Sequence, residues 1–165
     1  MKYLEKGGFQ GHPLMRLTLL WTLLFLSGLW VTNAVMYFQR MGLSPSSVRT
    51  YYLGSEEEFA QPKSVRAMTE VTHAHLPVMG VVVLLLTHLM IFSPWSDGTK
   101  KAMITLTFLS AFLGEASWWL VRFVHTGFAW LKVACFLLFQ ACLAALIAGL
   151  AAFLSAASAH GRRQG

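Results

Sequence analysis

The residues best suited to chemistry in this sequence are histidines within or next to long apolar stretches. His73 and His75 open one such stretch, His88 lies farther along it, and His125 ends the next one. Ionisable side chains inside a membrane span are costly, so they usually face the interior of a helix bundle or mark a cofactor or ion path. Neutral imidazoles bind haem iron and other metals. These four histidines are therefore candidate cofactor-binding residues.

The spacing of the histidines limits which of them can share a ligand. On a regular helix His73 and His75 point about 200° apart, so they cannot both bind one ion. His88 lies roughly 22 Å beyond His73 along the helix axis, and the neighbouring stretches offer it no obvious partner. His125 ends the following antiparallel helix and so returns to the membrane level of His73 and His75.

Two neutral imidazoles from facing helices are what a bis-histidine b-type haem requires. We therefore predict one haem b held by His125 and by either His75 or His73, with His75 and His125 as the favoured iron ligands. The His73-x-His75 spacing also keeps copper as a less favoured alternative cofactor. A structural role is the competing hypothesis for each histidine, because a histidine near a membrane surface often only hydrogen-bonds a carbonyl group or a lipid headgroup.

Glu115 is the other candidate for chemistry, because it falls near the middle of a predicted span. Arg122 follows seven residues later, on the same helix face and about 10 Å nearer the membrane surface. A proton or cation relay through Glu115 and Arg122 is one hypothesis. The favoured alternative is that Glu115 is protonated, or hydrogen-bonded to a Thr, a Ser or Asn33 of a neighbouring helix, and serves only to tie helices together.

Four apolar stretches must position these residues. Hydrophobic residues make up 56% of the 165 residues and charged residues 12%, which is roughly half the charged share of a soluble domain. We predict one all-α membrane domain over residues 1–165, an up-down bundle of four transmembrane helices at about 17–39, 65–92, 102–125 and 129–158. Ser64 is the expected N-cap of the second helix. The polar loop at 40–64 can form a short surface helix over Ser47–Leu53.

The net charge of +6 is spread over single basic residues and pairs between the spans. No basic stripe with interleaved aromatic residues is present, so nucleic acid is excluded as a partner and lipid headgroups explain the charge. Cys135 and Cys142 are seven residues apart on a helix, too far for a disulfide bond, and are expected to pack in the bundle.

The distribution of charge also suggests an orientation. The cations divide almost evenly between the two sides of the membrane, but Lys2, Lys6 and Arg16 precede the first helix and the loop at 40–64 carries the acidic run Glu56-Glu57-Glu58. Basic segments tend to stay in the cytoplasm. We therefore expect a multi-pass protein of a bacterial inner membrane, with both ends in the cytoplasm and the loop at 40–64 in the periplasm.

Two resemblances accompany these patterns. The segment Thr72-His73-Ala74-His75-Leu76, followed by Gly80 and an apolar run, resembles the His-x-His-Leu helix openings of membrane proteins related to haem-copper oxidase subunit I and of bacterial nitric-oxide-response membrane proteins. The chain lacks the further histidines of a binuclear site, so this resemblance does not imply oxygen reduction.

Most of the chain is similar to small uncharacterised four-helix proteins of the bacterial inner membrane, a resemblance that brings no established activity. It rests on four segments, namely Tyr51-Tyr52-Leu53-Gly54, Pro62-Lys63-Ser64, His73-Ala74-His75-Leu76 and Ser117-Trp118-Trp119-Leu120-Val121-Arg122.

Three functional hypotheses follow. The first is a cytochrome-like electron-transfer protein with one haem near the periplasmic face, which acts with other membrane or periplasmic redox proteins or as a homo-oligomer. The second is a non-enzymatic accessory or assembly subunit of a membrane complex. The third is a metal or proton transport component that uses Glu115. A redox carrier or accessory subunit is favoured over an enzyme.

Overall fold

Four long α-helices make up most of the molecule. The computed structural model describes residues 12–57 and 59–161, with side chains as far as residue 155. The long helices are α2 (Pro13–Arg40), α4 (Val65–Met90), α5 (Asp97–Phe123) and α6 (Ala129–Gly161). All four are long and apolar enough to cross a membrane. The predicted all-α fold with four membrane spans is therefore confirmed.

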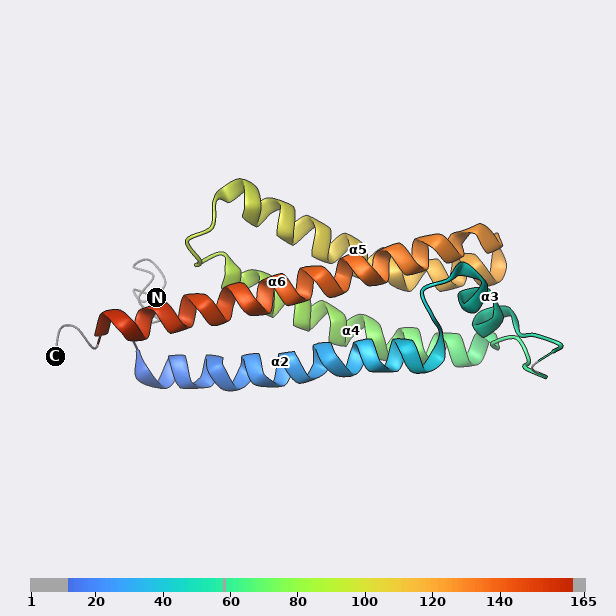
Figure 1. Cartoon of the computed structure of the whole chain (residues 1–165), viewed down its shortest axis with the longest axis horizontal. Helices are drawn as coiled ribbons and strands as arrows, with labels where there is room; N and C mark the ends of the chain where they lie inside the picture. Colours follow the sequence, from blue (N-terminus) through green and yellow to red (C-terminus); the bar gives the residue numbers. More distant parts are fainter. Residues whose placement is uncertain (1–11, 58, 162–165) are drawn as a thin grey trace.

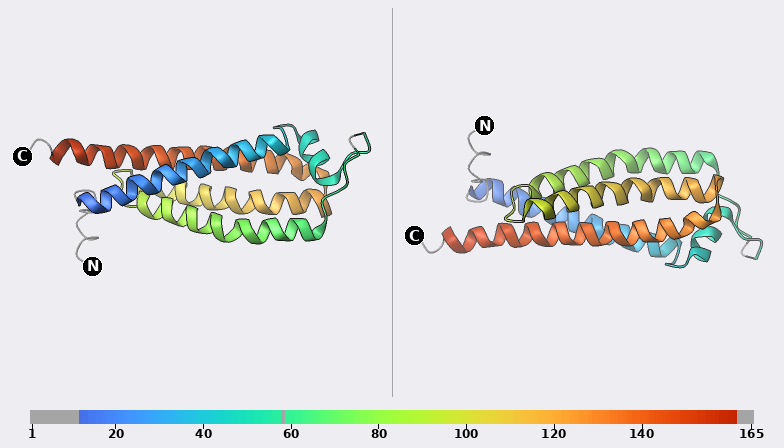
Figure 2. Two further views of the ribbon diagram at one scale, coloured as in Figure 1. Left: turned by 90° about the horizontal axis from the view of Figure 1, so that it is seen from below. Right: turned by 90° about the horizontal axis from the view of Figure 1, so that it is seen from above.

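The four helices lie side by side and alternate in direction (Figures 1 and 2). Helix α2 begins and α6 ends at one end of the bundle. At the opposite end, which we call the α3 end, lies the short helix α3 (Pro45–Leu53). Helix α6 packs against α2, α4 and α5, and α4 also packs against α5. This is the up-down arrangement that the short connections predicted.

Side-chain caps decide where the helices begin. The Ser64 hydroxyl accepts a hydrogen bond from the amide of Ala67, so the predicted N-cap of α4 is confirmed. The Ser96 hydroxyl caps α5 in the same way, by accepting from the amide of Thr99. Helix α5 therefore begins at Asp97 instead of the expected Ala102, because a serine cap satisfies a free amide group of the first turn.

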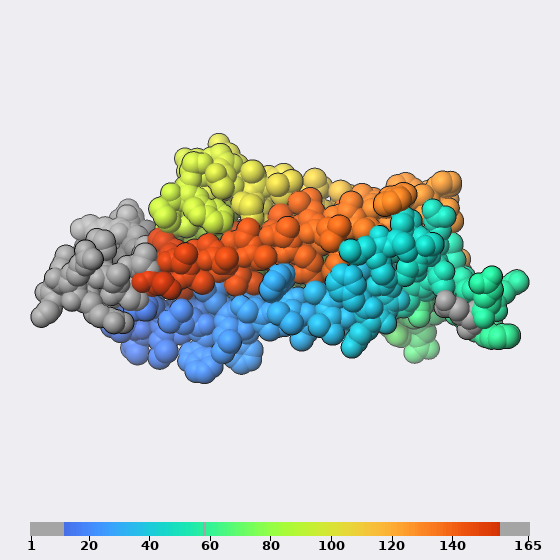
Figure 3. All heavy atoms as spheres, in the orientation of Figure 1, coloured from blue at the N-terminus to red at the C-terminus, as the bar shows by residue number. Residues whose placement is uncertain are grey.

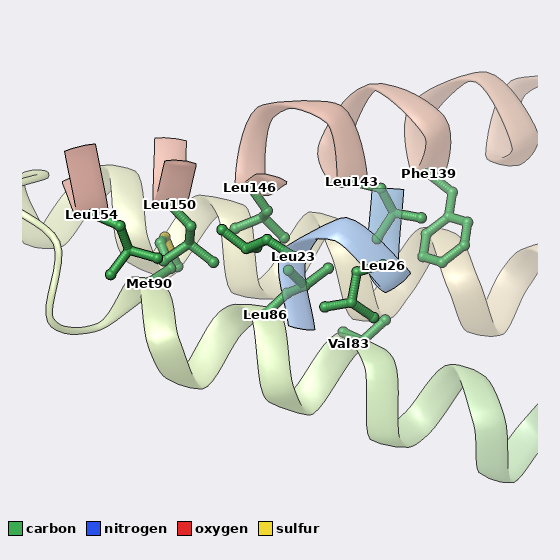
Figure 4. Packing of buried hydrophobic residues seen from close by; sticks show 10 residues of the cluster. All are labelled: Leu23, Leu26, Val83, Leu86, Met90, Phe139, Leu143, Leu146, Leu150 and Leu154. Carbon is green, nitrogen blue, oxygen red and sulfur yellow. The ribbon is translucent and has the colours of Figure 1, made fainter. Parts of the chain in front are cut away.

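The interior divides into two apolar clusters. The cluster away from α3 joins side chains of α2, α4 and α6 that point toward one another (Figure 4), and it consists of Leu23, Leu26, Val83, Leu86, Met90, Phe139, Leu143, Leu146, Leu150 and Leu154. The cluster at the α3 end is richer in aromatic residues and consists of Tyr37, Met41, Val48, Tyr52, Met68, Trp118, Val121, Ala129 and Val133. The polar residues of interest lie beside this second cluster.

Helix α3 covers one end of the bundle, where it packs on α5 and α6 (Figure 3). It begins at Pro45, slightly earlier than predicted, and it buries Val48 and Tyr52 instead of only resting on a surface. The chain leaves α3 through Gly54, whose φ of 83° suits glycine. The amide of Lys63 then donates to the carbonyl of Tyr52 over 3.0 Å.

Part of the sequence evidence for orientation falls on residues without described structure. Lys2, Lys6 and Glu58 lie outside the described residues. The expected orientation therefore stays a prediction.

Candidate functional site

A histidine of α4 and a glutamate of α5 meet inside the bundle. Nδ1 of His75 lies 3.0 Å from Oε1 of Glu115. The Glu115 side chain is 10% exposed and the His75 side chain 40% exposed. An ionised Glu115 accepts a hydrogen bond from His75, whereas a protonated Glu115 donates one to it. Glu115 therefore contacts a neighbouring helix through His75, whereas a Thr, a Ser or Asn33 was the expected partner.

The two neighbouring histidines of α4 take different surroundings. The His73 side chain is exposed, whereas the His75 ring lies almost parallel to the Trp118 ring, with the ring centres 6.4 Å apart. The sequence predicted opposite directions for these two histidines without showing which one points inward. The structure shows that it is His75.

Lys132 adds a third ionisable group, from α6. Its Nζ donates to the carbonyl of Gly114 over 3.0 Å and lies 5.6 Å from the centre of the Trp118 ring. Gly114 directly precedes Glu115, so the ammonium group lies beside the helix turn that carries the carboxylate. Lys132 was not among the predicted site residues. Its position one turn inside an otherwise apolar helix is the signal that could have identified it.

His75, Glu115 and Lys132 line one cavity of about 100 Å³. A water molecule occupies about 30 Å³ of liquid, so this space suits a few waters or one small ion. The cavity lies among four helices of the bundle and α3. Its other polar lining residues are Asn33, Tyr37, Arg40, Tyr52 and Ser110.

Two polar atoms in the cavity wall lack a protein partner. Oε2 of Glu115 and Nε1 of Trp118 are buried without a hydrogen-bond partner among the described residues. Trp118 itself is only 6% exposed. A buried polar atom left unsatisfied costs about 1–3 kcal/mol. One free acceptor and one free donor thus belong to residues that line the cavity, and a molecule bound there is a candidate partner for both.

Tyr52 closes the site from α3. Its side chain is 3% exposed, and its ring meets the Trp118 ring edge-on with the centres 5.7 Å apart. Burial raises the pKa of the Tyr52 phenol, and the negative charges of Tyr51 and Glu115 act in the same direction. The phenol therefore stays protonated at neutral pH and is available as a hydrogen-bond donor.

The remaining candidate histidines, His88 and His125, make contacts away from the Glu115 cavity. The exposed His125 is the N-cap of the short 3-10 turn η2 (Thr126–Phe128), where its Nδ1 accepts from the amide of Gly127 over 3.0 Å. The exposed His88 packs its ring edge against Phe92, with the centres 5.7 Å apart. Among the residues that the structure describes, no three His, Cys, Asp or Glu side chains form a group able to hold a metal ion.

Arg122 also has partners of its own. Its Nε donates to the carbonyl of Lys63 over 3.3 Å, and its guanidinium lies 5.2 Å from the centre of the Phe123 ring. Arg122 thereby fastens the segment before α4 to the end of α5. The two cysteines are free and buried, as expected, and Cys135 lines the cavity.

Comparison with known proteins gives a family but no function. The sequence profile of a family described as a transmembrane helical domain matches residues 42–161, which include α3, α4, α5 and α6. His75, Glu115 and Lys132 therefore all lie in the matched region. No curated protein and no solved structure matches the chain.

Proposed function

The chain belongs to the Aq_1264_TM family of transmembrane helical domains, and from this premise we propose that it takes up and releases a proton inside the bilayer. Glu115 is the proton-binding residue and His75 is the group that exchanges the proton with it. The observation that carries the proposal is the 3.0 Å contact between these two side chains at the wall of a cavity.

The contact allows a proton to move without any other rearrangement. In one form Glu115 is protonated and His75 is neutral. In the other form Glu115 is ionised and both nitrogens of His75 carry protons. The two forms hold the same number of protons and differ only in whether Glu115 or His75 carries the shared one. Positioned acid–base pairs of this kind are the usual means of proton transfer in proteins.

Lys132 offsets the charge that proton release creates. An isolated carboxylate in a membrane interior is costly, and such groups are usually paired. The Lys132 ammonium is held at the carbonyl of Gly114, next to Glu115 in the chain. The ionised form of Glu115 therefore has a positive charge close by.

The size of the cavity favours a proton over a large cofactor. Pockets for cofactors and drug-sized ligands measure about 300–1,000 Å³, whereas this cavity has about 100 Å³. Water molecules in such a space can carry a proton to Oε2 of Glu115, which has no partner among the described residues. A few waters are enough for that role.

Infrared difference spectra of the purified protein in lipid nanodiscs test the proposal. When the pH is stepped down, the wild type should gain the carbonyl band of a buried carboxylic acid. Glu115→Gln should lack this band. Glu70→Gln is the matched control, because Glu70 lies on α4 in an exposed ion pair with Arg66. A band that survives in Glu115→Gln contradicts the proposal.

A single b-type haem held by His75 and His125 is the second candidate function, with electron transfer to a membrane or periplasmic redox protein. One contact supports it. Metal-binding histidines usually donate their second ring N–H to a carboxylate, a backbone carbonyl or a water molecule. Nδ1 of His75 lies against Glu115, which leaves Nε2 for iron.

The visible spectrum of protein purified from haem-replete cells tests this second candidate. A Soret band that disappears in His75→Ala and in His125→Ala would support haem binding. Wild-type protein without a Soret band would exclude it.

We place the protein in a bacterial inner membrane with both chain ends in the cytoplasm, so that the α3 end faces the periplasm. The support is Lys2 and Lys6 before α2, Arg16 in its first turn, and the acidic run in the loop between α3 and α4. The proton then enters the Glu115 site from the periplasmic side.

A further inference from the structure

We propose that the cavity beside Glu115 also binds one small monovalent anion, of the size of azide or formate, and that this anion binds together with a proton on Glu115. The anion would lie between Arg40 and Lys132. Only the coupling of the anion to a proton on Glu115 rests on the proposed function. The anion site itself is inferred from the hydrogen-bond donors and the charges of the cavity.

The cavity wall offers far more donors than acceptors. Lys132 uses one of its N–H groups on Gly114, and its ammonium carries three. Trp118 Nε1 is a buried donor without a partner among the described residues. The Tyr52 phenol, kept protonated by burial, adds another donor. A wall of this kind, closed by aromatic rings, suits a negatively charged ligand.

The balance of charge explains why the anion and the proton bind together. Among the described lining residues, Arg40 and Lys132 are cations and Glu115 is the sole carboxylate. An anion placed beside an ionised Glu115 would meet a like charge at short range. When Glu115 takes a proton, the anion replaces the lost negative charge, so the net charge of the cavity does not change.

Every element around Glu115 contributes a titratable or charged group to this balance. His75 comes from α4, and α3 supplies Tyr52. The groups from α2 and α6 are Tyr37, Arg40, Lys132 and Cys135.

Two further cavities lead from the α3 end toward the site. The nearer one, of about 220 Å³, shares Arg40, Tyr52 and Trp118 with the Glu115 cavity. The outer one, of about 450 Å³, shares Arg40, Tyr51 and Lys63 with the nearer one. The side chains of Arg40, Tyr52 and Trp118 line both the nearer cavity and the Glu115 cavity, so these side chains lie between the inner site and the route.

The charge of this route favours anions over cations. Arg40 lines all three cavities, and Lys63 lines the outer two. None of the described residues that line these outer two cavities is acidic, because apart from the two cations their walls carry only hydroxyl, amide, indole or apolar side chains. Passages lined by one sign of charge concentrate ions of the opposite sign.

Isothermal titration of the nanodisc-embedded protein with sodium azide tests the inference, in two buffers with different heats of ionisation. Wild type should bind azide and take up about one proton for each azide bound. Lys132→Met and Arg40→Gln should each weaken binding about tenfold or more. Lys101→Met, an exposed cation at the other end of the bundle, should bind azide like the wild type. Arg40 is exposed, so its variant keeps the test valid if Lys132→Met fails to fold.

The outcomes separate this inference from the proposed function. Azide that does not bind, or that binds wild type and Arg40→Gln equally, overturns the anion site even if the infrared band of Glu115 is present. Glu115→Gln should bind azide without proton uptake. Wild-type binding without proton uptake overturns the coupling of anion to proton.

Discussion

The contact between His75 and Glu115 is the residue-scale feature on which the proposed chemistry depends. It joins α4 to α5 over 3.0 Å. What makes the pair distinctive is that the carboxylate is buried and shares its cavity with Lys132.

A double-mutant cycle measures the strength of this contact. His75→Ala and Glu115→Ala, alone and together, should give a coupling free energy of about 0.6 kcal/mol, the average for hydrogen bonds between membrane helices, and of at most about 1.7 kcal/mol. The measurement is equilibrium unfolding in mixed micelles. The Arg66–Glu70 ion pair, whose side chains are 90% and 64% exposed, is the control and should show no measurable coupling. An inner pair that couples no better than this exposed pair would contradict the assigned contact.

At the scale of elements, the turn between α4 and α5 is fixed against α6 by one close approach. Trp95 lies in this turn, and a Cβ atom added at Gly149 of α6 would lie 2.9 Å from its Cη2 and still nearer to its Cζ2. Gly149 is therefore needed because the Trp95 ring occupies the space of a side chain, and not because the backbone requires glycine. By helix propensity alone, alanine would be more stable at this position.

Gly149→Ala should therefore destabilise the protein by about 1–3 kcal/mol, the usual cost of overpacking. Thermal unfolding in detergent is the measurement. Gly80→Ala is the matched control in α4, where a Cβ would meet nothing within 4 Å, so it should be neutral or stabilising by up to about 1 kcal/mol. If both variants lose stability equally, Trp95 does not explain the glycine.

On the scale of the whole molecule, the outer surface is apolar because lipid surrounds it. Helix α2 buries few of its residues, and Phe25 near its middle is 76% exposed. In a water-soluble bundle such residues would favour aggregation. In a bilayer they are the normal contact surface, and charge there is penalised.

Phe25→Arg should therefore impair membrane insertion, because arginine at the centre of a span costs about 2.5–3.5 kcal/mol. The fraction of protein that stays in alkali-washed membranes measures this effect. Phe59→Arg is the control, since Phe59 is 93% exposed in the loop between α3 and α4. Equal membrane fractions for the two variants would argue that α2 does not cross the bilayer.

The sequence by itself determined the four spans, the up-down order and the Ser64 cap. These features depend on local properties, namely the length of an apolar run, the shortness of a connection and one hydroxyl at a helix start. Candidate ionisable residues could also be found in this way, because Glu115 and His75 interrupt apolar stretches.

Only the tertiary structure decided which of these residues meet. It turned His75 inward, gave Glu115 a histidine partner, directed Lys132 to the carbonyl of Gly114 and placed Tyr52 over the site. The helical period relates residues of one helix to one another, but it does not fix how each helix is rotated against its neighbours. That rotation is set by the packing of all the apolar side chains together, and it places the ionisable groups within hydrogen-bond distance.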